Sequence, residues 1–126
     1  MKVIFTEDAP KAVGPYSQAI RTGNLLYCSG QTPLDPVTMK IEASDIEGQT
    51  RQVIENIRLI LKEARLALDN VIKVNVFLTD MGLFAQMNAI YTEYFANHKP
   101  ARTTVGVKGL PLNALVEIEC IAEFNG

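Results

Sequence analysis

The sequence predicts an α+β domain in which two helices pack on one face of a mixed β-sheet. The chain has 126 residues, which is the length of one domain. Two stretches carry apolar residues at the helical spacing of three and four, and the other apolar segments are short and alternate with a period of two. We therefore expect a single domain over residues 1–126, with 48% hydrophobic residues to build its core.

Three strands are expected ahead of the first helix. Residues 2–6 and 16–21 have extended patterns, and the turn residues 22–24 join the second of these to residues 25–29 as a hairpin. Two X-Pro pairs within residues 32–36 then break the chain into a loop.

The longest periodic element predicts a helix over residues 46–67. Ser44 and Glu47 have the spacing of a capping box, in which each side chain satisfies a free backbone N–H group. Apolar residues then recur on one helical face, and charged residues occupy the opposite face. The apolar face consists of Ile46, Val53, Ile57, Ile60, Leu61, Ala64 and Leu68.

The second half of the chain predicts a strand, a helix and two further strands. Residues 72–79 alternate as a strand, and an apolar helical stripe follows Asp80 until Pro100 stops it. Residues 103–107 and 116–124 are the last strands. Because both helices cover the same face, the apolar residues on the other face need a further partner, which indicates an oligomer.

Composition and charge exclude several classes of function. Twelve Lys plus Arg against fourteen Asp plus Glu give a net charge of −2, so no nucleic acid and no anionic membrane is expected as a partner. No apolar run reaches the ~18 residues of a membrane span, and residues 1–8 do not resemble a signal peptide. Cys28 and Cys120 are too few for a disulfide scaffold, so we expect a cytoplasmic protein.

Motifs for metals and phosphates are missing from the sequence. The chain has one histidine, His98, which we expect to be solvated in a loop, and no Cys-x-x-Cys or His-x-x-x-His pair. No glycine-rich phosphate loop is present, which argues against hydride and phosphoryl transfer. A zinc site is therefore not expected.

The polar residues that could support chemistry each allow two interpretations. Arg102 opens a strand, where its guanidinium either grips a carboxylate through two parallel hydrogen bonds or is an exposed charge. Glu117 and Glu119 share one strand face, which either lines a cleft that activates water or faces solvent. Tyr16 either caps the core or offers a phenol to a ligand, and Ser29-Gly30 offers a hydroxyl and an open amide. None of these residues decides the function alone.

Taken in order, five segments resemble the Rid family of reactive intermediate deaminases, also called the YjgF family, and most closely its RidA-type branch. The resemblance covers essentially the whole chain. It is carried by Ala12-Val13-Gly14-Pro15-Tyr16-Ser17-Gln18-Ala19, Ser29-Gly30-Gln31-Thr32-Pro33, Phe84-Ala85-Gln86-Met87-Asn88, Pro100-Ala101-Arg102-Thr103, and Leu110-Pro111 with Val116-Glu117-Ile118-Glu119-Cys120-Ile121-Ala122.

This resemblance implies a chorismate mutase-like fold, a six-stranded sheet backed by two helices, and a homotrimer whose sheets close into a barrel. The ligand sites would then lie between neighbouring subunits. The implied activity is that of an imine or enamine deaminase, which hydrolyses 2-iminobutanoate and 2-iminopropanoate to 2-oxo acids and ammonia. Pyridoxal-phosphate dehydratases that act on threonine and serine release these imines. No metal and no organic cofactor is implied.

The resemblance also assigns roles to individual residues. Arg102 matches the arginine that clamps the substrate carboxylate, Glu117 matches a glutamate associated with water, and Tyr16 matches the tyrosine that closes the site. The expected substrate-binding walls are Ser29, Gly30, Phe84, Asn88, Thr104 and Val105. Thr104 stands where many relatives have a cysteine, so no thiol-dependent activity is implied. Residues 64–67 are expected to continue the helix where most relatives have a glycine-containing turn.

A function without catalysis is an alternative. A regulatory trimer would bind a keto acid or an amino acid in its clefts and report metabolic state to a partner, and an inert structural trimer would do neither. Turnover distinguishes them, because a sensor releases its ligand unchanged. The presence of Arg102, which some branches of the family lack, favours an active deaminase.

Overall fold

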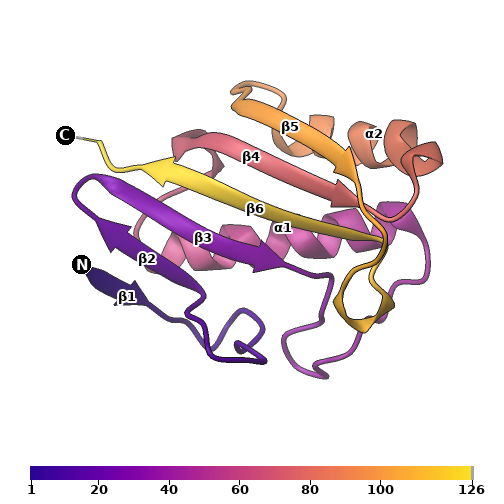
Figure 1. Ribbon diagram of the computed structural model, residues 1–126. Coiled ribbons are helices and arrows are strands. Elements are labelled where there is room, and N and C mark those ends of the chain that lie inside the picture. Colours follow the sequence, from indigo (N-terminus) through magenta and orange to yellow (C-terminus); the bar gives the residue numbers. More distant parts are fainter. Residues whose placement is uncertain (126) are drawn as a thin grey trace.

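The computed structural model describes residues 1–125 and places both helices against one face of a six-stranded sheet (Figure 1). The α+β class and the predicted order of elements are confirmed. The strands are β1 (Lys2–Ile4), β2 (Ala19–Thr22), β3 (Leu25–Gln31), β4 (Val71–Leu78), β5 (Ala101–Gly106) and β6 (Val116–Glu123). The helices are α1 (Ile46–Glu63) and α2 (Phe84–Tyr94), with the short 3-10 helices η1 (Leu68–Asn70), η2 (Met81–Leu83) and η3 (Pro111–Asn113).

The sheet is mixed and has the strand order β1-β2-β3-β6-β4-β5. All neighbouring strands are antiparallel except β4 and β5, which run parallel because α2 connects them in a crossover. This topology makes β5 an edge strand, packed on one side only (Figure 1).

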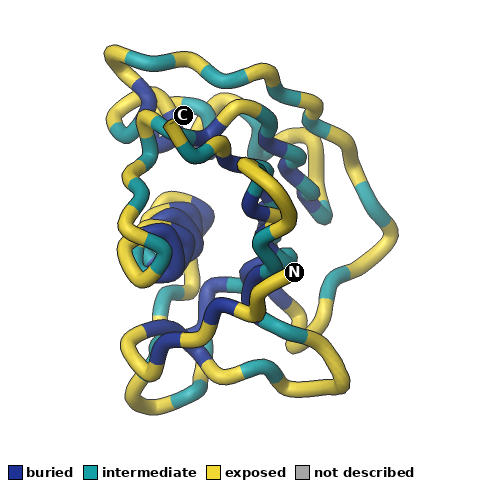
Figure 2. The backbone as a smooth tube through the Cα atoms, turned by 90° about the vertical axis from the view of Figure 1, so that its left-hand side faces the viewer, coloured by how far each residue is buried: buried dark blue, intermediate teal, exposed yellow. Residues whose placement is uncertain are grey.

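The core lies between α1 and the sheet. Figure 2 shows α1 nearly end-on, with its buried side turned toward the strands. Val53 and Ile60 on α1 are fully buried, as are the inward residues of β6, of which Val116 is one. Removing a buried side chain of this size from water contributes about 1.5–3 kcal/mol, so the predicted apolar face of α1 fixes the helix on the sheet.

The opposite face of the sheet is not covered by any described helix. Because Leu26 and Cys28 of β3 are buried, the alternation of the strand turns Tyr27 to this open face, where it is 45% exposed. On the edge strand, Val105 also lies on the open face and is 40% exposed. The expectation of an uncovered, partly apolar sheet face is therefore met.

The start of α1 corrects the predicted capping box. Asp45, not Ser44, is the N-cap residue, and its Oδ1 accepts a hydrogen bond of 3.2 Å from the N–H of Gly48. An aspartate caps at least as well as a serine and adds a negative charge at the positive end of the helix. The helix therefore begins at Ile46, as predicted, but with a different cap.

The end of α1 corrects the predicted length, because the helix stops at Glu63 and does not reach residue 67. Arg65 has a φ of +63°, in the left-handed region. The N–H of Leu66 donates to the carbonyl of Leu61, and the N–H of Arg65 donates to that of Lys62. This pair of bonds is a Schellman motif, here built without the glycine that usually occupies the left-handed position.

Buried polar side chains hold the loops that surround the sheet end. Gln18 is 3% exposed and its amide bonds to the backbone of Thr6 and Pro10. On α1, Asn56 donates to the carbonyl of Leu34 at 2.9 Å, and Gln49 accepts from the N–H of Leu115 at 2.8 Å. The loops before β2, after β3 and before β6 are thus tied down.

His98 is not the solvated loop histidine that the sequence predicts. Its Nε2 lies 2.6 Å from the carbonyl oxygen of Val71, at the start of β4, and the residue is partly buried. Within residues 1–125, no group of three metal-ligating side chains comes together, and none of the described helices is both long and apolar enough to cross a membrane.

Candidate functional site

Several of the predicted site residues gather in one hollow on the open face of the sheet, which we call the carboxylate hollow. It has a volume of about 460 Å³. Its lining comes from the loop before β2, the end of β3, the η3 segment and β6. The polar residues of the lining are Tyr16, Ser29, Thr32, Glu117 and Glu119.

A bulge in β3 brings Gly30 against Glu117. The pairing of β3 with β6 shifts between Cys28 and Gln31, so that Ser29 and Gly30 lie opposite the single residue Glu119. A Cβ atom at position 30 would collide with the carboxylate of Glu117. The space left by the missing side chain of glycine is therefore where the carboxylate sits, and this explains the glycine at the end of the strand.

Glu117 has an environment that suits proton transfer. Partial burial raises the pKa of its carboxyl above the ordinary value of 4.5, and the charge of nearby Glu119 raises it further. Glu119 is itself held by the Asn75 amide, which donates to it at 3.1 Å. A carboxylate whose pKa lies closer to neutrality is the better general base and can also return the proton.

Tyr16 and Ser29 lie on the rim of the same hollow. The phenol oxygen of Tyr16 accepts a hydrogen bond of 3.3 Å from the N–H of Val13, which leaves its own proton for another acceptor. The hydroxyl of Ser29 donates to the carbonyl of Ser17 at 2.6 Å, so it faces the hollow as an acceptor. Both predicted residues can therefore contact a small polar ligand.

Arg102 lies in a second hollow, between α2 and the edge strand β5, which we call the arginine hollow. The volume of this hollow is about 360 Å³, and Asn88 and Lys99 also line it. The Nη1 of Arg102 donates to the Oδ1 of Asn88 at 2.7 Å. Two cations in one hollow suit an anionic ligand, and the guanidinium matches the geometry of a carboxylate.

Within one chain the two hollows do not form a single site. Glu117 points to the open face, whereas Arg102 contacts α2 on the helix face. Two strand spacings separate β6 from β5, roughly 10 Å, and the pairing of the two residues with β4 differs by three positions, roughly 10 Å more. A ligand of three or four carbons spans only about 5 Å and cannot touch both groups in one chain.

The other predicted binding residues do not all face a hollow. Phe84 is partly buried beside Arg102, and the distance from the guanidinium carbon of Arg102 to the centroid of the Phe84 ring is 5.6 Å. The Oγ1 of Thr104 is buried and has no hydrogen-bond partner among the described residues. Val105 lies on the open face.

Some residues of the two hollows were not singled out by sequence reasoning. Leu112 lines the carboxylate hollow with a φ of +61°, a conformation that no sequence signal announces for leucine. Lys99 lines the arginine hollow, although it stands just before the Pro100-Ala101-Arg102-Thr103 segment. Tyr91 lies on the apolar stripe predicted after Asp80. Its spacing from Phe84 and Asn88, at seven and three residues, puts the three on one face of α2.

Comparison with known proteins identifies the family. The profile of a family described as endoribonuclease L-PSP matches residues 6–124. A RutC family protein of Pyrococcus horikoshii is 57% identical over 121 residues, which cover 96% of each chain.

Solved structures agree over almost the whole length. A protein of the Rid family from Yersinia pestis is 48% identical, with a TM-score of 0.94 over 97% of this chain and 98% of that one. TdcF of Escherichia coli with bound serine is 39% identical, with a TM-score of 0.94 over 99% of this chain and 100% of that one. The chain therefore belongs to the endoribonuclease L-PSP family, the same family as the YjgF and Rid proteins.

Proposed function

We propose that this protein hydrolyses short 2-imino acids, with 2-iminobutanoate and 2-iminopropanoate as the substrate class. Water adds to the C2 atom of the protonated imine, the C2–N bond breaks, and the products are the 2-oxo acid and ammonium. The enamine tautomers enter the same reaction after protonation at C3. This reaction needs a group that holds a carboxylate, a group that accepts and returns a proton, and no redox partner.

The observation that carries the proposal is the presence, on one chain, of two separate hollows whose groups are chemically complementary. One presents the guanidinium of Arg102 at a strand edge, and the other presents Glu117, a carboxyl whose pKa is raised by burial. Arginine and carboxylate form charge-assisted bonds that fix the substrate in one orientation. Holding the imine carbon near a positioned water removes much of the entropy cost of the attack.

In this proposal Glu117 accepts a proton from the attacking water and returns it to the leaving nitrogen. Its raised pKa supports the first step, because a raised pKa makes the carboxylate a stronger base toward the attacking water. Tyr16 supplies a hydrogen-bond donor at the rim, where it closes the hollow over the substrate. General acid–base catalysis of this kind contributes about 10²- to 10⁴-fold.

The separation of the hollows supports a homotrimer with its sites between subunits. Arg102 lies on the edge strand β5, and Glu117 lies on the open face of the sheet. If the open face of one chain packs beside the edge of the next, the arginine of one protomer approaches the carboxylate of its neighbour. The exposed apolar residues of the open face, with Tyr27 and Val105 among them, are then buried by this packing.

The bound ligand of a relative supports the substrate class. TdcF of Escherichia coli was solved with serine, an amino acid of three carbons. Serine shares its carboxylate and its C2 nitrogen with 2-iminopropanoate. We therefore propose that this chain consumes imines released by pyridoxal-phosphate dehydratases that act on serine and threonine.

The test couples the purified protein to a threonine dehydratase and traps the released imine with semicarbazide. We expect the protein to divert imine into 2-oxobutanoate and to lower the rate of semicarbazone formation, whereas Arg102→Ala leaves trapping close to the rate without protein. If the wild-type protein leaves trapping unchanged, the deaminase proposal fails. Binding of 2-oxobutanoate without turnover would then point to the regulatory alternative.

A further inference from the structure

One face of α2 is built around the side chain of Arg102. Phe84, Asn88 and Tyr91 follow one another at steps of four and three residues, which aligns them on one side of the helix. The guanidinium carbon lies 4.6 Å from the ring centroid of Tyr91 and 5.6 Å from that of Phe84. Asn88 completes the set by accepting the hydrogen bond of 2.7 Å from Nη1.

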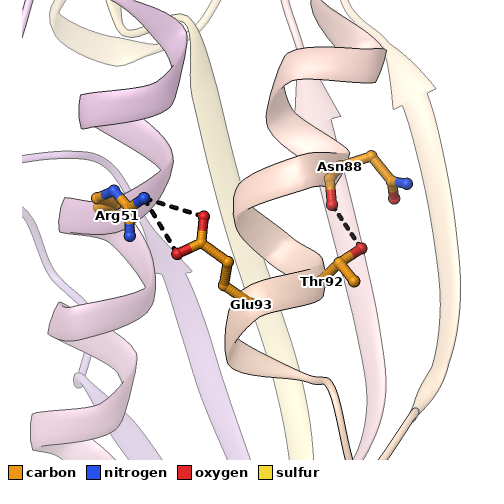
Figure 3. Close-up of polar contacts among 4 residues, drawn as sticks. All are labelled: Arg51, Asn88, Thr92 and Glu93. Carbon is orange, nitrogen blue, oxygen red and sulfur yellow. Dashed lines mark hydrogen bonds and ion pairs between the residues drawn. The ribbon is translucent and has the colours of Figure 1, made fainter.

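The opposite face of α2 is fixed to α1. Glu93 accepts two hydrogen bonds from Nη2 of Arg51, at 3.0 and 3.2 Å, and Figure 3 shows this pair between the two helices. The side chain of Asn88 projects away from α1 in the same view. The helix therefore presents its second face, with the three residues around Arg102, toward the edge strand.

We propose that Phe84, Asn88 and Tyr91 are positioning residues that hold the Arg102 guanidinium in the orientation that receives the substrate carboxylate, an inference that rests on the proposed function. This differs from the expectation that Phe84 and Asn88 are walls of the substrate site. The Oδ1 of Asn88 is already engaged by the arginine. Phe84 and Tyr91 offer their ring faces to the cation.

The hydroxyl of Tyr91 supports a role for the ring itself. The residue is only 7% exposed, and its Oη has no hydrogen-bond partner among the described residues. A buried hydroxyl without a partner does not stabilise the fold, and its burial keeps a ligand from reaching it. The part of Tyr91 that makes contacts is its ring, which packs against the ring of Phe95 and against the guanidinium of Arg102.

The geometry leaves the arginine ready to bind. A guanidinium has five N–H groups, and the bond to Asn88 uses one of them. The others remain for a bidentate contact with a carboxylate. Fixing the side chain before the substrate arrives spares the rotamer entropy that a free arginine would lose on binding.

The experiment compares Tyr91→Leu and Tyr91→Phe, with Tyr94→Leu as the control on the same helix. We expect Tyr91→Leu to raise the KM for 2-iminobutanoate about 3- to 30-fold with a smaller change in kcat, the fold-change of a lost cation–π contact. Tyr91→Phe keeps the ring and rescues KM, and Tyr94→Leu leaves KM at the wild-type value. In an Arg102→Ala background the comparison uses the residual kcat/KM at high protein concentration, and Tyr91→Leu causes no further loss there, because the two residues act as a unit.

A second measurement does not depend on turnover. Side-chain ¹⁵N relaxation of the Arg102 Nε reports an order parameter, expected near 0.85 in the wild type and below about 0.6 in Tyr91→Leu. An equal order parameter in both proteins, or an undiminished effect of Tyr91→Leu on the residual kcat/KM in the Arg102→Ala background, overturns the inference. Absence of turnover in the wild type contradicts the proposed function instead. The relaxation result then still decides whether these residues hold Arg102.

Discussion

At the scale of single residues, Arg102 is the group on which substrate binding depends most in the proposed function. Its replacement by alanine removes the charge-assisted clamp, worth about 1.5–3 kcal/mol, and we expect kcat/KM for 2-iminobutanoate to fall at least tenfold. Arg102→Lys keeps the charge but not the planar fork, so it should recover only part of the loss. An alanine variant with full kcat/KM contradicts the clamp.

The raised pKa of Glu117 predicts how the stability of the protein depends on pH. The native structure raises the pKa of this carboxyl above 4.5, so folding favours the protonated form of Glu117. The resulting contribution to the free energy of unfolding is fully present below pH 4.5 and is lost as the pH rises through the raised pKa. Glu117→Gln should therefore melt at a higher temperature than the wild type at pH 7, with a smaller difference at pH 4. The same variant should lose about 10²- to 10⁴-fold in kcat. A Tm difference that is the same at both pH values contradicts the assignment.

Gly30 tests the fit of the carboxylate hollow. In Gly30→Ala the new methyl group displaces the carboxylate of Glu117, the flexible end of a side chain, so the backbone should stay in place. We expect kcat to fall about 10- to 100-fold, the cost of moving a catalytic group by roughly 1 Å. Gly109→Ala is the control, because no atom lies within 4 Å of the added Cβ. Equal kcat values for the two variants would show that the contact between Gly30 and Glu117 is unimportant.

At the scale of elements, the end of α1 predicts a change in stability. Arg65 holds a φ of +63°, which a glycine adopts without steric cost. We expect Arg65→Gly to stabilise the protein by about 0.5–1 kcal/mol in urea unfolding at a fixed chain concentration. Gly23, with a φ of +58° in the β2–β3 turn, gives the converse: Gly23→Ala should destabilise by about 1–2 kcal/mol. Destabilisation by Arg65→Gly would contradict the assigned strain.

The same helix shows what the sequence predicts well and what it does not. The apolar spacing from Ile46 to Leu61 predicts α1 and its buried face because periodicity reflects burial directly. The end of the helix was missed because the left-handed turn is made by Arg65, and nothing in an arginine announces that conformation. The cap was missed because Ser44 fits the capping box with Glu47, whereas Asp45 is simply another preferred N-cap residue, and the choice between them depends on how the preceding loop enters the helix.

The candidate site also combines features that the sequence predicts with features that it does not. Alternation along β6 correctly predicts that Glu117 and Glu119 share the face away from the core. Spacing along the chain does not reveal the bulge that puts Gly30 against Glu117, since the bulge arises from pairing between β3 and β6. Nor does it show that Arg102 faces α2, because the crossover from β4 to β5 decides which side of the edge strand meets the helix.

At the scale of the whole molecule, the assembly is the first thing to measure. Three chains of 13.9 kDa give about 42 kDa, and we expect light scattering to report this mass at micromolar concentration. The reason is physical: a sheet face that leaves Tyr27 and Val105 exposed in one chain is stabilised when neighbouring copies cover it. A mass of one chain contradicts the shared site.

The measurement that tests the central claim most directly mixes two strongly impaired variants. Arg102→Ala retains Glu117, and Glu117→Gln retains Arg102, so a mixed trimer contains some interfaces with both native groups. With equal amounts of the two chains, random assembly restores about one site in four, and the trapping assay should report about a quarter of the wild-type rate. A rate no higher than that of the separate variants would mean that each site lies within one chain, which contradicts the account.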